Sequence, residues 1–106
     1  MAEKGFKVTR HKGFHITFEN GLTVSVQFGV GNYCENRDAD FDEAKKTEKW
    51  TSRNAEVAIW DKNDKWLTKE YVEQKGEKAY DDVVGWVLPS EVLKILNWAE
   101  NYKEGK

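Results

Sequence analysis

Two alternating apolar segments around an Asn-Gly pair constrain the fold of this chain more than any other feature. Every second residue is apolar on both sides of that pair, at Phe14, Ile16, Phe18, Leu22, Val24, Val26 and Phe28. Successive side chains of a strand point to opposite faces of a sheet, so this period of two predicts a β-hairpin over residues 13–29. Asn20-Gly21 predicts a type I′ turn, which requires positive φ at both central residues.

The two faces of this hairpin differ in chemistry. The apolar face must pack against another element of the chain. The opposite face carries polar side chains, which are His15, Thr17, Thr23, Ser25 and Gln27. We expect this second face to be partly solvated or to face a ligand.

Other segments with strand character extend the sheet. Residues 6–10 predict an edge strand, with a solvated basic arm as the alternative. Residues 54–61 predict a strand, residues 61–65 a turn, and residues 66–68 the returning strand, which brings Trp60 close to Trp66. Residues 79–88 predict one more strand.

Two segments carry weaker signals. Residues 35–49 mix both signs of charge densely and predict a long loop, with one helical turn near residues 41–44. Residues 69–74 are compatible with a continued strand and with a helical turn, and Gly76 interrupts either one, so the pattern leaves the structure of residues 35–52 and 69–78 undefined.

The C-terminal segment predicts a helix. Pro89 suits a first helical turn, Glu91 complements the positive end of the helix dipole, and apolar residues follow the i, i+3, i+4 rule at Val92, Ile95, Leu96, Ala99 and Tyr102. The order of elements predicts one α+β domain over residues 1–106. We expect an antiparallel sheet of about four to five strands, two hairpins plus a later strand, packed on the C-terminal helix.

Composition narrows the classes of function. Seventeen basic and nineteen acidic residues give a net charge of −2, so no global field attracts the chain to nucleic acid or to an anionic membrane. The first five residues lack the apolar stretch of a signal peptide, and no run reaches the roughly 18 apolar residues that span a bilayer. A single cysteine fits a reducing compartment, so we expect a cytoplasmic location.

Metal and cofactor binding have little support in the sequence. Asp38, Asp40 and Asp42 resemble the opening of a calcium loop, but Glu43 stands where that loop requires Gly and Lys49 where it requires Glu. His11 and His15 are four residues apart, yet the surrounding alternation places them on a strand or turn, where this spacing does not pair two metal ligands. We therefore expect no metal ion and no cofactor.

Nucleophilic catalysis has one candidate. Arg37 is close enough in sequence to activate the thiol of Cys34, and His15 could act as its base. Single cysteines of small domains are more often buried, so a chain without enzymatic activity is the favoured interpretation and no catalytic residue is assigned.

One segment resembles a known group of proteins. Residues 13–29, GFHITFENGLTVSVQFG, continuing through GNYC at residues 31–34, look like a segment of small uncharacterised proteins of bacteriophages and bacterial mobile elements. Residues 54–60, NAEVAIW, and residues 85–87, GWV, fit the same resemblance. It implies no activity or catalytic residue, but small phage accessory proteins commonly bind a host or defence component.

Two hypotheses of function follow. The first is a non-enzymatic accessory domain that binds a host or defence protein, in the manner of a phage-type or anti-CRISPR-like inhibitor, through Asp38, Asp40, Asp42, Trp50 and Trp66. The second is a small-molecule or nucleotide-binding domain, a sponge for a signalling molecule, that uses His15, Thr17, Ser25, Gln27, Asn32, Tyr33 and Arg37. The oligomeric state stays open, although basic residues near Lys7 and Arg10 discourage pairing through the edge strand.

Overall fold

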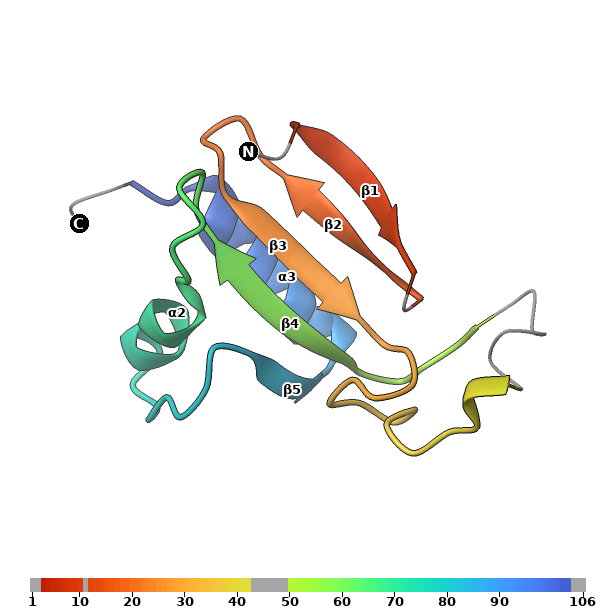
Figure 1. Cartoon of the computed structure of the whole chain (residues 1–106). Helices are drawn as coiled ribbons and strands as arrows, with labels where there is room; N and C mark the ends of the chain where they lie inside the picture. The colour runs from red at the N-terminus through yellow and green to blue at the C-terminus, as the bar shows by residue number, and fades with distance from the viewer. Residues whose placement is uncertain (1–2, 11, 43–49, 104–106) are drawn as a thin grey trace.

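The protein is a five-stranded antiparallel sheet with helices on one face (Figure 1). The structure is a computed structural model and describes residues 3–10, 12–42 and 50–103. Its strands are β1 (Gly5–Thr9), β2 (Gly13–Thr17), β3 (Thr23–Gln27), β4 (Ala55–Trp60) and β5 (Val84–Val87), and its helices are α2 (Thr68–Gln74) and α3 (Pro89–Glu100). The strands follow one another in the sheet in chain order. The predicted α+β class is therefore confirmed.

The hairpin of β2 and β3 forms the centre of the sheet, with the predicted faces. Phe14 pairs with Val26 and Ile16 with Val24, and β4 continues these rows with Val57 and Ile59. Val24, Val57 and Ile59 are fully buried, together with Ile95 of α3. The apolar alternation of the sequence is thus the core between the sheet and α3.

The turn of this hairpin differs from the predicted type I′ turn. Only Gly21 has positive φ, 89°, whereas the type I′ geometry requires it at Asn20 as well. The amide of Gly21 donates to the carbonyl of Phe18, and the amide of Phe18 donates to Leu22, which closes a three-residue loop. The Asn20 side chain is held elsewhere, because its Nδ2 donates to the carbonyl of Ala99 at the end of α3 at 2.8 Å.

The prediction of a returning strand at residues 66–68 is wrong. Trp66 forms only an isolated bridge with Trp60, and helix α2 begins at Thr68. The Thr68 hydroxyl accepts the amide of Ile59 at 2.9 Å, so a side chain takes the place of the next ladder bond. Because Thr68, Tyr71 and Val72 are buried at helical spacing, residues 68–74 gain more contact with the core as a helix than as a strand.

Strand β5 is shorter than the predicted strand over residues 79–88. It pairs Val84 with Val57 and Val87 with Ala55, with two residues of β5 opposite Glu56 alone. This arrangement is a β-bulge, and the other end of β4 is already occupied by Trp66 and Leu67.

Of the predicted helical turn at residues 41–44, the last two residues lie outside the described part of the chain, as do His11, Glu43 and Lys49.

Helices α2 and α3 are joined by polar contacts as well as by the core. Tyr71 Oη and Lys75 Nζ both donate to Glu91 Oε2, the latter at 2.8 Å. Trp98 Nε1 donates to Gln74 Oε1 at 2.8 Å, and the Trp98 ring meets Tyr71 edge to face. These contacts fix α2 against α3 beside β4.

Candidate functional site

The helices leave one half of the apolar sheet face uncovered. A helix is about 10–12 Å wide and strands are about 4.8 Å apart, so one helix covers two or three strands. Helix α3 lies behind β3 and β4, while β1 and β2 extend beyond it (Figure 1). The face of β1 and β2 that points to the helix side therefore has no covering element among the described residues.

The uncovered half carries large apolar side chains. Phe6 pairs with Ile16 and Val8 with Phe14, so all four point to the face that α3 covers farther along the sheet. Phe6 is 85% exposed and Val8 is 86% exposed, whereas Phe14 and Ile16 are partly buried. We call Phe6, Val8, Phe14 and Ile16 the β1–β2 patch.

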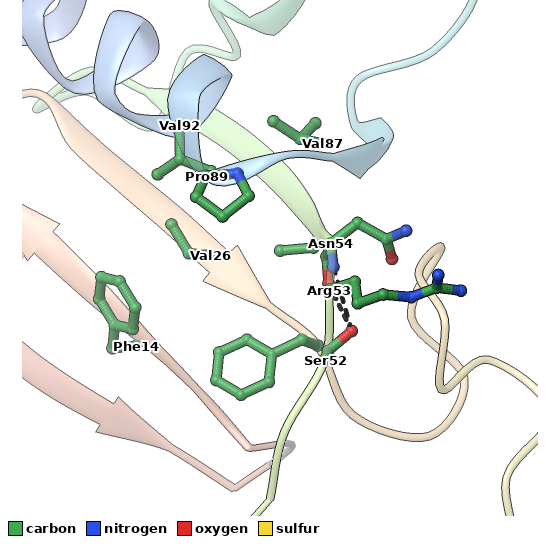
Figure 2. Close-up of a pocket in the computed structure, with 10 residues that line it drawn as sticks. Phe14, Val26, Ser52, Arg53, Asn54, Val87, Pro89 and Val92 are labelled. Carbon is green, nitrogen blue, oxygen red and sulfur yellow. Dashed lines mark hydrogen bonds between the residues drawn. The ribbon is translucent and has the colours of Figure 1, made fainter.

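A cavity of about 250 Å³ continues this patch toward α3 (Figure 2). Phe14 and Val26 form its sheet side and Pro89 and Val92 its helix side, while residues 52–55 close one end. Phe14 belongs both to the patch and to the cavity wall. The apolar surface is therefore continuous from the edge strand to the first turn of α3.

Strand β1 is also an open edge. It is the first strand in the order of the sheet, and no described strand pairs with its outer side. Its own segment is basic, because residues 3–12 contain Lys4, Lys7, Arg10 and Lys12 against one acidic residue, Glu3, although Lys4 is paired with Glu19 at 2.7 Å. An open edge next to exposed apolar side chains is a template for adding a strand from another chain.

The opposite face of the sheet holds the side chains predicted for a small ligand. Lys7, His15, Ser25 and Ala58 form one cross-strand row. The His15 ring meets Trp60 edge to face at 5.1 Å, and Trp60 meets Trp66 in the same way at 5.4 Å. Burial in the first place, and the charge of Lys7 in the second, lower the pKa of His15.

The centre of this face is less accessible than the sequence suggests. Thr17, Thr23 and Ser25 are each less than 10% exposed, and the hydroxyls of Thr17 and Thr23 bond to each other at 2.8 Å. Gln27 donates to Ser25 Oγ and accepts the hydroxyl of Thr9. These polar groups are therefore already satisfied within the sheet.

The remaining predicted ligand residues gather at the far end of the same face. Asn32 Nδ2 and the Tyr33 amide donate to the two oxygens of Glu56, each at 3.1 Å. The Tyr33 ring stacks on Trp86 at 5.7 Å with an interplanar angle of 11°. The guanidinium carbon of Arg37 lies 5.7 Å from the centre of the Tyr33 ring.

The residues predicted to contact a protein partner differ in position. Asp38, Asp40 and Asp42 are exposed, and Asp40 Oδ1 accepts the amide of Asp42. Trp50 is half-buried, and its Nε1 donates to the carbonyl of Phe28 at 2.8 Å, which fixes the end of the loop on β3. Trp66 is 49% exposed and lies near Trp60 and His15, on the sheet face opposite the helices.

Cys34 lies in a setting that suits a structural thiol. It is 2% exposed, and its Sγ donates to the carbonyl of Gly29.

Among the described residues, no three His, Cys, Asp or Glu side chains gather closely enough to hold a metal ion. Within the same part of the chain, no helix is long and apolar enough to cross a membrane.

Comparison with protein-family models, with curated proteins and with solved structures finds no match to this chain. Function is therefore inferred from its own side chains and surfaces.

Sequence reasoning missed two features of the surface. The sequence does not predict the β1–β2 patch, because residues 6–10 fit a solvated basic arm as well as an edge strand. The signal that could have indicated it is that one long helix is too narrow to cover a sheet of five strands. The exposure of Trp86 depends on the bulge in β5, and no local sequence pattern predicts that bulge.

Proposed function

We propose that this chain is a non-enzymatic protein-binding domain that docks its partner on the β1–β2 patch. The observation that carries the proposal is the near-complete exposure of Phe6 and Val8 on the core-facing side of an edge strand. Contiguous exposed apolar surface on a soluble domain typically marks an interaction site. Burying the Phe6 and Val8 side chains against a partner removes their apolar surface from water, which favours binding.

The geometry of the edge favours a specific docking mode. A partner segment that adds to β1 as a strand would satisfy the free backbone groups and place every second side chain over the patch. Its other side chains would lie beside Lys7 on the opposite face. A partner with alternating apolar and acidic residues fits both sides of β1, because the surroundings of the strand are basic.

The resemblance to small phage and mobile-element proteins supports a host or defence protein as the partner, and an inhibitor as the role. The buried thiol of Cys34 supports binding rather than nucleophilic catalysis.

The test compares two pairs of substitutions in a bacterial host. Phe6→Ser with Val8→Ser removes the exposed apolar side chains of β1. Tyr80→Ser with Phe41→Ser is the matched control, since Tyr80 is 79% exposed and Phe41 50% exposed outside the patch. We expect the first pair to lose the partner that the unchanged chain captures and the control to retain it, with both pairs folded by circular dichroism. Retention of the partner by the first pair would refute the proposal.

A second candidate function has its own observation. A cavity of about 550 Å³ on the sheet face opposite the helices is lined by side chains that include Glu3, Lys4, Lys7, His15, Thr17 and Trp60. Lys7 and the Trp60 ring suit a small anionic ligand such as a nucleotide, whereas Lys4 is already paired with Glu19 at 2.7 Å. A thermal-shift screen against nucleotides and cyclic nucleotides tests it, since a ligand at 100 times its Kd adds about 2.7 kcal/mol of stability. No shift with any of them would remove this candidate.

A further inference from the structure

Trp86 has a backbone conformation that a bulky residue rarely adopts. Its φ is 51°, in the left-handed region that carries a cost of roughly 1–2 kcal/mol for a residue with a Cβ atom. It belongs to the bulge that sets Gly85 and Trp86 opposite Glu56. The strain is accompanied by exposure rather than by burial, because 53% of the Trp86 surface is accessible. Strained, exposed residues of this kind are found at binding sites.

The Trp86 ring is in contact with Tyr33. Its amide donates to the carbonyl of Tyr33 at 2.8 Å, and the ring stacks on the Tyr33 ring. The two segments approach so closely that a Cβ atom on Gly85 would lie 2.7 Å from the Cβ of Tyr33. A glycine is therefore required next to Trp86, and the two rings are stacked without a ligand.

Glu56, which lies opposite Trp86 in the sheet, has no cationic partner among the residues that the structure describes. Glu56 is half-buried, and within the described part of the chain its carboxylate accepts hydrogen bonds from Asn32 Nδ2 and the Tyr33 amide. No Lys or Arg nitrogen of the described residues forms a salt bridge with it. A partly buried carboxylate in this state favours the approach of a cation.

The charge of the neighbouring segments has the same sign. Residues 33–42 and 80–86 contain six acidic side chains and one basic side chain, Arg37. One of the six, Glu35, is paired with Arg53 at 2.7 Å. This excess of negative charge repels phosphate groups and so disfavours a nucleotide on the Trp86 ring.

The ring pair already contacts one guanidinium, that of Arg37 over Tyr33. A planar guanidinium stacks on an aromatic face and bonds to a carboxylate at the same time, which an ammonium group does less well. We propose that the exposed face of Trp86, with Glu56 opposite it in the pairing of β4 with β5, is a binding site for the arginine side chain of a partner protein. This site is distinct from the β1–β2 patch and does not depend on it.

The test uses a blocked tetra-arginine peptide as the probe, with a tetra-lysine peptide and maltotetraose as comparisons. Binding is followed through the indole N–H signals of the five Trp residues by NMR. We expect tetra-arginine to shift the Trp86 signal most, and to bind at least about fivefold more weakly to Trp86→Ala and to Glu56→Gln. Trp66→Ala is the matched control, since Trp66 is 49% exposed at the opposite end of the face and should leave the affinity unchanged.

Two further variants separate the possible outcomes. Trp86→Gly accommodates the positive φ, so it removes the ring even if Trp86→Ala fails to fold. Phe6→Ser with Val8→Ser should leave tetra-arginine binding intact, which keeps this test independent of the proposed docking on β1. Equal binding of tetra-lysine, a response to maltotetraose alone, or no shift of Trp86 would each overturn the proposal.

Discussion

The side chain of Asn20 joins the central hairpin to the end of the last helix, and its replacement by aspartate gives a sharp test of the fold. Asn20 Nδ2 donates to the carbonyl of Ala99 at 2.8 Å and lies 3.3 Å and 3.4 Å from the carbonyls of Glu100 and Tyr102. Its Oδ1 accepts the amide of Leu22 at 3.0 Å. The side chain therefore satisfies carbonyls that the end of a helix leaves without partners.

The magnitude follows from these contacts. Asn20→Ala removes one short hydrogen bond and one of moderate length, worth about 1–2 kcal/mol of unfolding free energy together. Asn20→Asp keeps the acceptor for Leu22 but loses the donor, which costs about 1 kcal/mol. It also places a negative charge at the negative end of the α3 dipole, which adds about 0.5–1 kcal/mol.

The pH dependence distinguishes this account from a simple loss of packing. The carbonyls of α3 disfavour the ionised form of the new aspartate, so its pKa in the folded state is raised above the ordinary value. The penalty is therefore full at neutral pH. It diminishes as the pH falls through the folded-state pKa toward the unfolded value of about 4, where the protonated acid donates to Ala99 again.

Urea unfolding followed by Trp fluorescence measures these free energies. Asn63→Ala is the control, because Asn63 lies exposed in the turn after β4 and should change stability by less than about 0.5 kcal/mol. A penalty for Asn20→Asp that is absent at pH 7, or that does not shrink at acid pH, would refute the reasoning.

Three further predictions concern other contacts. Hydrogen bonds from Lys75 and then Tyr71 hold the pKa of Glu91 below its ordinary value, so its stabilising effect should fade as the pH falls through that pKa. Glu91→Gln should lower stability by roughly 0.5–1 kcal/mol at pH 7 and flatten the acid slope of urea unfolding, whereas an unchanged slope would exclude this ion pair as its source. Because burial and Lys7 lower the pKa of His15, stability should decrease as the pH falls below about 6.5, and Lys7→Gln should raise the His15 pKa in an NMR titration. Finally, Trp86→Gly should be more stable than Trp86→Ala by about 1 kcal/mol in urea unfolding, the reverse of the usual order in a strand, and the usual order would show that φ is not positive there.

The sequence predicts the centre of this fold because the period of two and the period of 3.6 are local signals. Alternation assigned Val24 and Val26 to the core face, and the spacing of Val92, Ile95 and Ala99 assigned the face of α3. Both assignments are confirmed, since the packing of sheet and helix requires no more than these two stripes.

The predictions of local structure that are wrong concern segments whose form depends on contacts between residues far apart in the sequence. The loop at Asn20 takes its form while its side chain bonds to Ala99, 79 positions away. Thr68 begins a helix where a strand was expected, because its hydroxyl bonds to Ile59 across the end of β4. No window of neighbouring residues contains that information.

The residues predicted to bind a small ligand lie in two different settings. The polar face of the hairpin was expected to be available, but Thr17 and Ser25 are buried and bonded within the sheet. Asn32, Tyr33 and Arg37 do gather at one end of that face, as the exit from the hairpin suggested. The proposed docking of a partner through Asp38, Asp40 and Asp42 stays a prediction.

Hydrogen exchange on the complex tests the central claim, that a partner protein binds at β1, most directly. The partner captured by the unchanged chain is purified and mixed with it, and amide exchange is compared with that of the free chain. Binding at the open edge predicts strong protection of the Gly5–Thr9 amides, with little change in α2, which lies beside β4 and away from the β1 edge. Unchanged exchange in β1 on saturation with the partner would contradict the claim.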